Sequence, residues 1–266
     1  MKGFFEIKNL TCGYENNFHV NNINLEVSKG NLVGIIGPNG CGKTTLLKGI
    51  TGEIKNETGT VKLNGINLDQ ISFREKAQIL AVVTQDIEVP DMTVEDYVLM
   101  GRIPYHKNFQ FFDTSEDIAI AEKYMDLTRV THLKNMYLNR LSGGERQLIA
   151  ITRALVQEPE LLLLDEPTSH LDITHQVQVL NLVQRMNEQF GLTVFMVIHD
   201  LNLAGEYCNQ LIMLNKGIVH TIGTPEDVLT YDNIENVYET VVVTKTNPVS
   251  KKPVVLLVSE KVLKKK

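Results

Sequence analysis

Cysteine is scarce in this sequence, and long apolar runs are missing. The 266 residues hold three cysteines, Cys12, Cys41 and Cys208. Their wide spacing matches neither a disulfide framework nor a zinc site, so we expect a reducing compartment. No apolar run approaches the roughly 18 residues that span a bilayer, and residues 1–9 lack the apolar core of a signal peptide. If the protein serves transport, we expect the membrane pore to belong to another chain.

An excess of positive charge is also missing. The chain carries 26 Lys and Arg against 32 Asp and Glu, which gives a formal net charge of −6. A general nucleic-acid binder more often presents a basic field, so we predict no nucleic-acid partner. The tail from residue 241 alternates short apolar runs with lysines and ends in Lys264, Lys265 and Lys266. This pattern favours a small strand pair with a solvated end over a membrane-binding patch.

The apolar periodicity predicts an α/β protein with a helical insertion. Its predicted strands are residues 4–9, 20–27, 32–37, 60–63, 81–84, 161–164, 193–198 and 210–214. One predicted helix starts at Lys43, and the others cover residues 72–80, 93–100, 114–127, 142–157, 173–190 and 201–207. Residues 92–158 show only helical patterns, whereas strands and helices alternate afterwards. That alternation is typical of a parallel sheet covered on both faces.

One glycine-rich segment fits the phosphate-loop pattern G-x-x-x-x-G-K-[ST]. Its residues are Gly37, Pro38, Asn39, Gly40, Cys41, Gly42, Lys43 and Thr44, and Thr45 follows. Glycines let successive backbone N–H groups point at phosphate oxygens, and the following helix adds its positive N-terminal end. Lys43 is placed to reach the β- and γ-phosphates, and the Thr44 hydroxyl to ligate Mg²⁺. We count all nine residues as predicted nucleotide contacts.

Cys41 lies among the amides of this loop. A thiol in such a position is expected to have a lowered pKa and to react readily. The simpler interpretation is that any small side chain fits there. The first interpretation predicts that ATP protects Cys41 from alkylation.

Four leucines precede two acids at residues 161–166. An apolar run of this kind predicts a strand buried on both faces, and ligands sit at the carboxyl ends of such strands. Asp165 is therefore a candidate to hold Mg²⁺. If the strand continues, Glu166 points to the side opposite Asp165, where it could accept a proton from the attacking water or orient it.

A second glycine pair opens the helix predicted at residues 142–157. Ser142 is a natural N-cap, and Glu145 three residues later completes a capping box. Two glycines, Gly143 and Gly144, in the first turn lower helix stability. They are useful where a ligand must approach the backbone, so we predict a second anion site.

From residue 3 to about 240 the sequence resembles the ABC ATPase family. Leu141-Ser142-Gly143-Gly144-Glu145 matches that family's signature, which other P-loop NTPases lack. The resemblance implies that Tyr14 stacks on adenine and that Gln85 touches Mg²⁺ and senses a membrane partner. It implies that Asp172 belongs to the D-loop, Ser169 to Asp172, and that His199 contacts the γ-phosphate. With Glu166 and Lys43, the residues Gln85 and His199 form the predicted catalytic set, and Thr44, Gln85 and Asp165 the metal set.

The resemblance also implies a fold and partners. We expect a P-loop NTPase core with a mostly parallel sheet, an N-terminal antiparallel β subdomain and an inserted helical subdomain. Residues 1–240 would form the ATPase domain, with the insertion at about 92–158, and 241–266 a C-terminal extension. Two copies would pair head to tail, so that Ser142, Gly143 and Gly144 of one hold the ATP bound by the other. ATP binding would close this dimer, and hydrolysis with product release would open it.

Further segments resemble the importers of iron–siderophores, haem and vitamin B12. They are residues 170–176, 101–105 and 74–77. The resemblance implies an ATPase subunit on the cytoplasmic face of the cell membrane, a separate polytopic permease and, indirectly, an extracytoplasmic substrate-binding protein. Residues 85–105 would form the groove for a permease helix. The apolar side chains in this segment would line the groove or pack into the insertion's own core. They are Met92, Val94, Tyr97, Val98 and Met100.

Four alternatives can be compared with these motifs, and the last two stay open. A GTPase should show N-K-x-D, but residues 215–218 lack the aspartate. A P-loop kinase offers no reason for Ser142-Gly143-Gly144. A non-transport ABC ATPase, or an ABC importer of another substrate class, would share every motif above.

Overall fold

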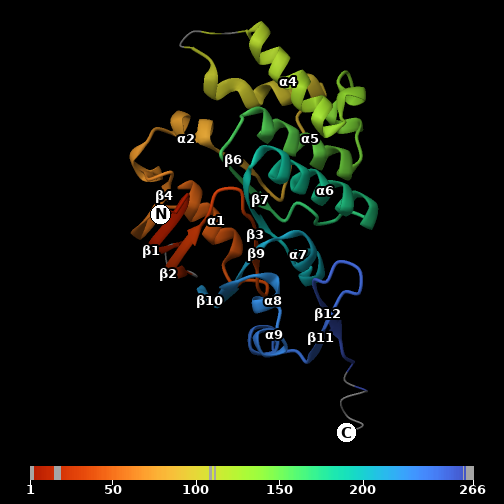
Figure 1. The fold of residues 1–266 in the computed structure, drawn as a ribbon. Helices are drawn as coiled ribbons and strands as arrows, with labels where there is room; N and C mark the ends of the chain where they lie inside the picture. Colours follow the sequence, from red (N-terminus) through yellow and green to blue (C-terminus); the bar gives the residue numbers. More distant parts are fainter. Residues whose placement is uncertain (1–2, 15–18, 108–109, 111, 260, 262–266) are drawn as a thin grey trace. The chain divides into compact units, whose positions relative to one another are not determined.

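The structure is a computed structural model that describes residues 3–14, 19–107, 110, 112–259 and 261. The chain forms two compact units (Figure 1). The first consists of Met1–Gln70 and Phe195–Lys266, and the second of Ile71–Val194. The predicted basic end, residues 264–266, lies outside the described residues.

The first unit contains an antiparallel sheet in the order β2-β1-β4-β5. Its strands are β1 (Phe5–Gly13), β2 (His19–Val27), β4 (Asn56–Leu63) and β5 (Ile66–Asn67). Buried and more exposed residues alternate along much of β1 and β2, as one covered face requires. The ring of Phe5 packs edge-on against Phe195 with 5.0 Å between ring centroids. The N-terminal antiparallel β subdomain implied by the resemblance is therefore confirmed.

A second group of strands in this unit leads into the phosphate loop. The strands are β3 (Leu32–Ile36), β9 (Gln210–Asn215) and β10 (Ile218–Gly223). β3 pairs parallel with β9, and β9 pairs antiparallel with β10. Every residue of β3 is buried, as predicted for a strand covered on both faces. The sequence did not predict β10, because none of its residues is buried and it has no apolar run.

Helices and a hairpin complete the first unit. The helices are α1 (Lys43–Thr51), η1 (Leu68–Gln70), α7 (Leu201–Tyr207), α8 (Pro225–Val228) and α9 (Tyr231–Tyr238). The strands β11 (Val242–Thr246) and β12 (Pro253–Leu257) pair antiparallel within the tail. The short helices α8 and α9 were not predicted, although Thr224 and Thr230 cap them as local N-cap signals would.

The second unit is mostly helical. Its helices are α2 (Phe73–Ile79), α3 (Val94–Leu99), η2 (Met100–Tyr105), α4 (Ser115–Thr128), η3 (Thr131–Leu133), η4 (Leu138–Arg140), α5 (Gly143–Val156) and α6 (Ile173–Phe190). The strands β6 (Leu80–Val83) and β7 (Leu161–Asp165) pair parallel, so their carboxyl ends share one edge. Strand β8 (Thr193–Val197) begins in this unit and ends in the first. Among the described residues of 92–158 the structure has helices and no strand, as the periodicity predicted.

Helices α3, α4 and α5 pack against one another around a shared apolar core. Val94, Tyr97, Met125 and Ile149 are among its buried side chains. The side-chain hydroxyls of Thr93, Thr114 and Ser142 accept hydrogen bonds from backbone amides in the first turn of each helix. These caps explain why the three helices start where the sequence predicted.

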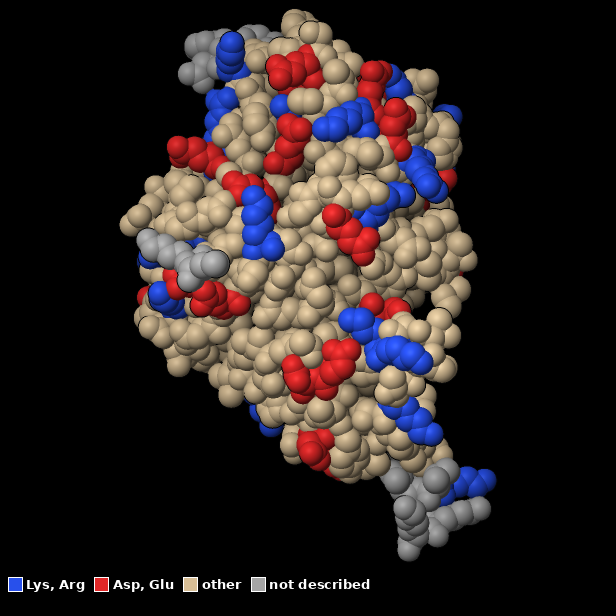
Figure 2. All heavy atoms as spheres, in the orientation of Figure 1, with Lys and Arg blue, Asp and Glu red and all other residues tan. Residues whose placement is uncertain are grey.

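Two surface properties bear on function. On the face drawn in Figure 2, acidic and basic side chains are interspersed rather than separated into fields of one sign. Within the ranges that the structure describes, no helix is both long enough and apolar enough to cross a membrane.

Candidate functional site

The phosphate loop occupies the link between β3 and α1. Gly37, Gly40 and Gly42 have φ angles of 147°, 75° and 106°, which side chains with a Cβ rarely adopt. A Cβ on Gly37 would also lie 2.3 Å from the carbonyl oxygen of Leu214. The loop conformation therefore depends on glycine, as the motif predicts.

Lys43 folds back over this loop. Its side chain is buried, and Nζ donates hydrogen bonds to the carbonyl oxygens of Gly37 at 2.8 Å and Pro38 at 3.1 Å. This geometry fixes an ammonium group against the loop, while Thr44 and Thr45 continue the first turn of α1. A positive charge and a helix N-terminus thus converge at one place, which suits a polyphosphate.

The prediction of a lowered pKa for Cys41 is wrong. Burial raises the pKa of the Cys41 thiol above its ordinary value, against the opposing effects of the Lys43 charge and the backbone amides. The side chain is only 4% exposed. Desolvation of the thiolate outweighs the loop's positive potential, so the interpretation as a small side chain that fits is the better one.

Two tyrosines from distant parts of the chain reach this region of the first unit. Tyr14 is 44% exposed and lies near Lys48 on α1, whose pKa is raised chiefly by Glu53 with a smaller contribution from Tyr14. Tyr238 on α9 lies near Cys41 and the backbone of Gly37. Burial raises the pKa of Tyr238, Cys41 adds to the rise and the Gly37 backbone opposes it. Sequence reasoning missed Tyr238, because no local pattern signals a contact between residues so far apart.

His199 follows β8 in the first unit and is exposed. The backbone N–H of Ile198 donates to the carbonyl of Ile35 at 3.2 Å, so the end of β8 lies beside the strand that enters the phosphate loop. Asp200 caps α7 by accepting from the amides of Asn202 and Leu203. The structure therefore brings His199 close to the start of the loop through strand pairing.

The carboxylate group of the second unit lies at the shared edge of β6 and β7. Asp165 ends β7 and is 8% exposed. Glu166 accepts a hydrogen bond from Nε2 of Gln85 at 2.9 Å and from the hydroxyl of Ser169 at 2.7 Å, both on Oε2. The two predicted residues Gln85 and Glu166 are thus in direct contact. Ser169, known from the sequence only as the first D-loop residue, donates to the same carboxylate oxygen as Gln85.

The conditional prediction for Glu166 did not apply, since β7 ends at Asp165. Glu166 has a φ of 51°, in the left-handed region that few residues with a Cβ adopt. Its direction is set by this backbone turn and by the bonds from Gln85 and Ser169, not by strand alternation. Unusual backbone geometry at a carboxylate is a feature common at functional sites.

The signature segment forms the predicted capping box. The carboxylate of Glu145 accepts from the Ser142 amide at 2.8 Å and from its hydroxyl at 2.7 Å, and the Glu145 amide donates to the Ser142 hydroxyl. The hydrogen bonds from Ser142 hold the pKa of Glu145 below its ordinary value, and the nearby His132 and His175 add to this. Ser142 and Gly143 are exposed, so this segment is not buried within its own unit.

Gly144 lies directly under the His175 ring. A Cβ built on Gly144 would be 2.1 Å from Cδ2 of His175, and the ring is held by Asp172, which lies 2.9 Å from Nδ1. Asp172 also caps α6 by accepting from the His175 amide at 2.9 Å. Asp172 is therefore joined to the signature segment through His175, a residue that the sequence marked only as part of a family match.

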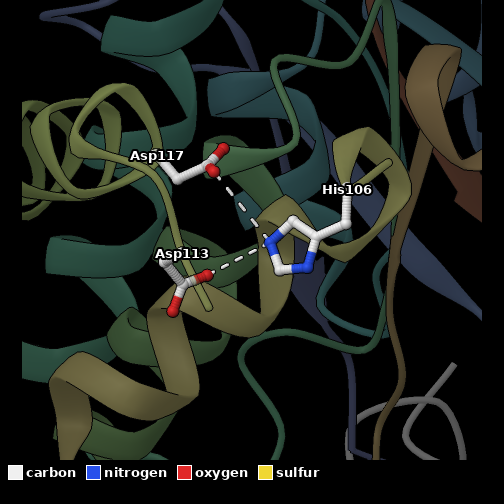
Figure 3. Close-up of side chains that lie close together, drawn as sticks. All are labelled: His106, Asp113 and Asp117. Carbon is white, nitrogen blue, oxygen red and sulfur yellow. Dashed lines mark hydrogen bonds and ion pairs between the residues drawn. The ribbon is translucent and has the colours of Figure 1, made fainter. Parts of the chain in front are cut away.

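Another cluster, His106, Asp113 and Asp117, brings three groups of metal-ligating type together (Figure 3). Nε2 of His106 is 3.2 Å from Asp113 and 4.0 Å from Asp117. Oδ2 of Asp117 already accepts two bonds from Thr114, and Oδ1 accepts one from Arg102 at 3.1 Å. Because both lone pairs of Oδ2 are used, this oxygen, the one near His106, could bind a metal only by displacing the cap of α4. The cluster fits an ion-pair network better than a metal site.

Comparison with known proteins agrees with the motifs. A family model described as ABC transporter matches residues 20–169, more than half of the chain. The chain belongs to the ABC transporter family. A relative from Bacillus subtilis (strain 168), the iron(3+)-hydroxamate import ATP-binding protein FhuC, is 38% identical over 248 residues, which are 93% of this chain and 92% of the relative. This member of the family is accordingly an ATP-binding, ATP-hydrolysing cassette.

Solved structures give the same family. A metal-chelate type ABC transporter in an inward-facing conformation superposes with a TM-score of 0.83 at 30% identity, covering 96% of each chain. A bacterial ABC transporter cassette solved as a dimer gives a TM-score of 0.74 at 27% identity, covering 83% of this chain and 98% of its own. The predicted fold class, a P-loop NTPase core of the α/β class, is confirmed.

Proposed function

We propose that this ABC ATPase energises an importer that takes up an iron chelate, such as a siderophore or haem, or a cobalamin-like compound. Support comes from FhuC, named for iron(3+)-hydroxamate import, and from the metal-chelate type transporter. We infer that it works on the cytoplasmic face of the membrane with a separate polytopic permease, and indirectly with an extracytoplasmic substrate-binding protein.

The proposed nucleotide contacts come from the phosphate loop and from Tyr14. The loop residues Gly37 to Thr45 would hold the phosphates through backbone N–H groups, with Lys43 at the β- and γ-phosphates. The exposed ring of Tyr14, near Lys48 on α1, is available to stack on adenine. The position of Lys43 against the loop supports this assignment.

The observation that carries the proposed mechanism is Glu166 held between Gln85 and Ser169. The donors Gln85 and Ser169 on Oε2 fix the direction of the Glu166 carboxylate, which suits a base that orients and deprotonates the attacking water. We propose His199 as the group that binds the γ-phosphate while Lys43 stabilises its developing charge.

The residues proposed for Mg²⁺ carry the oxygen donors that this ion prefers. They are the hydroxyl of Thr44, the carboxylate of Asp165 and the side-chain carbonyl of Gln85. Because the Gln85 amide nitrogen donates to Glu166, its oxygen is the atom available to a metal. When bound, Mg²⁺ would neutralise charge on the β- and γ-phosphates.

We further propose that two copies pair head to tail. The exposure of Ser142 and Gly143 leaves the signature segment able to face a second molecule. In this arrangement Ser142, Gly143 and Gly144 of one copy bind the ATP held by the phosphate loop of the other, and Asp172 lies near the same junction. The dimeric cassette is a precedent for such pairing.

The permease groove proposed at residues 85–105 must use other side chains than most of those first considered. Val94, Tyr97 and Val98 are buried in the core of the insertion, and Met92 packs against it. Met100, Ile103 and Val89 are 39%, 55% and 39% exposed. These three side chains are the apolar contacts that we propose for a permease helix.

The substitution Glu166→Gln tests the mechanism. It keeps the size of the side chain and removes the base, so ATP should still bind, hydrolysis should fall by about 100-fold or more, and an ATP-bound dimer should accumulate. Phosphate release and size-exclusion chromatography with ATP measure both effects. Glu188→Gln, on the exposed side of α6, is the matched control and should hydrolyse ATP normally. Near-normal turnover of Glu166→Gln would remove Glu166 from the mechanism.

Ser142→Arg tests the head-to-tail arrangement. The variant should bind ATP as a monomer but fail to form the closed dimer, because a long cation occupies the place of a small donor. Dimerisation with ATP at the normal level would refute the arrangement. Purification of the tagged chain from its native membranes tests the transport role: a polytopic permease should co-purify, whereas its absence would favour a non-transport ABC ATPase.

A further inference from the structure

A pocket of about 510 Å³ lies wholly within the second unit, where the end of α4 meets α5 and α6. This volume falls in the range of small-molecule sites, roughly 300–1,000 Å³. Apolar side chains, including Val130, Leu133 and Leu182, form part of its lining. None of its lining residues belongs to the predicted nucleotide, metal or catalytic sets.

The polar part of the lining is rich in cationic and imidazole groups. Arg129, Arg185, His132 and His175 line the pocket, and Glu145 is its one carboxylate. Glu145 is engaged by Ser142 in the capping box. Within the described part of the chain, neither Arg129 nor Arg185 forms an ion pair, so two arginines line a pocket whose only acid is already occupied.

Both arginines are placed by the end of α4. Nη2 of Arg185 donates to the carbonyl of Leu127 at 3.0 Å, and its Nε is buried with no hydrogen-bond partner. Arg129 ends α4 with a φ of 63°, where glycine is the usual residue. A buried donor without a partner costs free energy, and so does a left-handed arginine. An anion bound beside these groups would offset such costs.

We propose that this pocket binds a small organic anion, with an apolar body on the leucine and valine side chains and a carboxylate or phosphate at the two arginines. The pocket also adjoins the signature segment through two residues of its lining. Glu145 caps Ser142, and the His175 ring lies over Gly144. An anion there repels the Glu145 carboxylate and competes with Asp172 for His175, so it should inhibit ATP hydrolysis. This inhibition rests on the proposed role of the signature segment, whereas the binding does not.

Binding is tested with three probes of similar shape: phenyl phosphate, benzoate and the neutral benzyl alcohol. The full chain, labelled with ²H and ¹⁵N, is titrated in the presence of saturating Mg²⁺ and ADP, which occupy the phosphate loop. We expect the amide signals of residues 128–133, 145–148 and 175–185 to shift with one of the two anions, and benzyl alcohol to bind at least about tenfold more weakly. The stronger of the two anions identifies the acid group.

Arg129→Gln is the informative variant, because Arg129 is exposed and its removal leaves the bond from Arg185 to Leu127 in place. Its dissociation constant for the anion should rise about tenfold. Lys123→Gln, an equal change of charge on the exposed side of α4, should not alter it. Equal binding of the neutral probe, an unchanged constant in Arg129→Gln, or shifts at other residues would overturn the site.

A separate measurement tests the coupling to hydrolysis. The anion should inhibit ATP hydrolysis by the wild-type protein at the concentration that half-saturates the pocket, and inhibition of Arg129→Gln should need about ten times more. Binding without inhibition would refute the coupling but keep the site. Loss of hydrolysis in Ser142→Arg without loss of anion binding would separate this site from the proposed nucleotide contacts.

Discussion

A methyl group on Gly144 has no room beneath the His175 ring. Its Cβ would lie 2.1 Å from Cδ2 and 2.4 Å from Cγ of His175. The ring cannot swing away freely, because Nδ1 lies 2.9 and 3.0 Å from the two carboxylate oxygens of Asp172. The neighbouring Gly143 offers an internal control, since a Cβ there would meet only Leu171 at 3.9 Å.

The two substitutions should therefore differ in their effects on stability. Overpacking costs about 1–3 kcal/mol, and alanine in place of glycine in a helix recovers up to about 1 kcal/mol. Gly144→Ala should lower the free energy of unfolding by about 1–2 kcal/mol. Gly143→Ala should leave it unchanged or raise it by up to about 1 kcal/mol.

Urea unfolding followed by circular dichroism measures the difference between the two variants. A double-mutant cycle with His175→Ala adds a direct test, because Gly144→Ala should cost little once the ring is absent. Equal stability of Gly143→Ala and Gly144→Ala, or an undiminished cost of Gly144→Ala beside His175→Ala, would refute the packing argument.

Three further predictions concern buried ionisable groups. Arg102→Gln should lower the free energy of unfolding by about 3–5 kcal/mol in the same urea assay, because it removes the guanidinium charge that pairs with the buried Asp117. Burial alone would raise the pKa of Asp117, but hydrogen bonds from Thr114 and Arg102 lower this pKa below the ordinary 3.8. The ionised carboxylate therefore stabilises the fold fully above pH 3.8, and this contribution is lost as pH falls through the lower pKa of the folded state. The difference in unfolding free energy between wild type and Asp117→Asn should accordingly narrow below about pH 4. Cys41 in the native protein should react with iodoacetamide at pH 7.5 at least about tenfold more slowly than in the urea-unfolded chain, because burial raises the pKa of its thiol. Mass spectrometry measures the labelling, and rapid labelling of the native protein would contradict this prediction.

Much of the site could be predicted because its signals are local. The phosphate loop needs glycine wherever its φ angles are positive, and the capping boxes at Thr114 and Ser142 need only residues three positions apart. A buried strand such as β7 can be predicted from an unbroken apolar run that ends in an acid. Each of these features depends on the backbone of a few consecutive residues.

Other features depend on contacts that cross the sequence. The pKa of Cys41 rises because distant segments bury it, a contribution that local amides could not reveal. Likewise, the burial of Val94, Tyr97 and Val98 in the insertion's core depended on how α3 packs, since one apolar face can serve either a core or a partner.

The residues alone thus determined the kinds of chemical group present, their order and the elements that carry them. Tertiary structure decided which groups meet: Gln85 with Glu166, His175 with Gly144, and Arg129 with Arg185 around a pocket that no motif signals. The physical reason is that hydrogen bonds, burial and charge act over a few ångströms in space, whereas a motif records only neighbours along the chain.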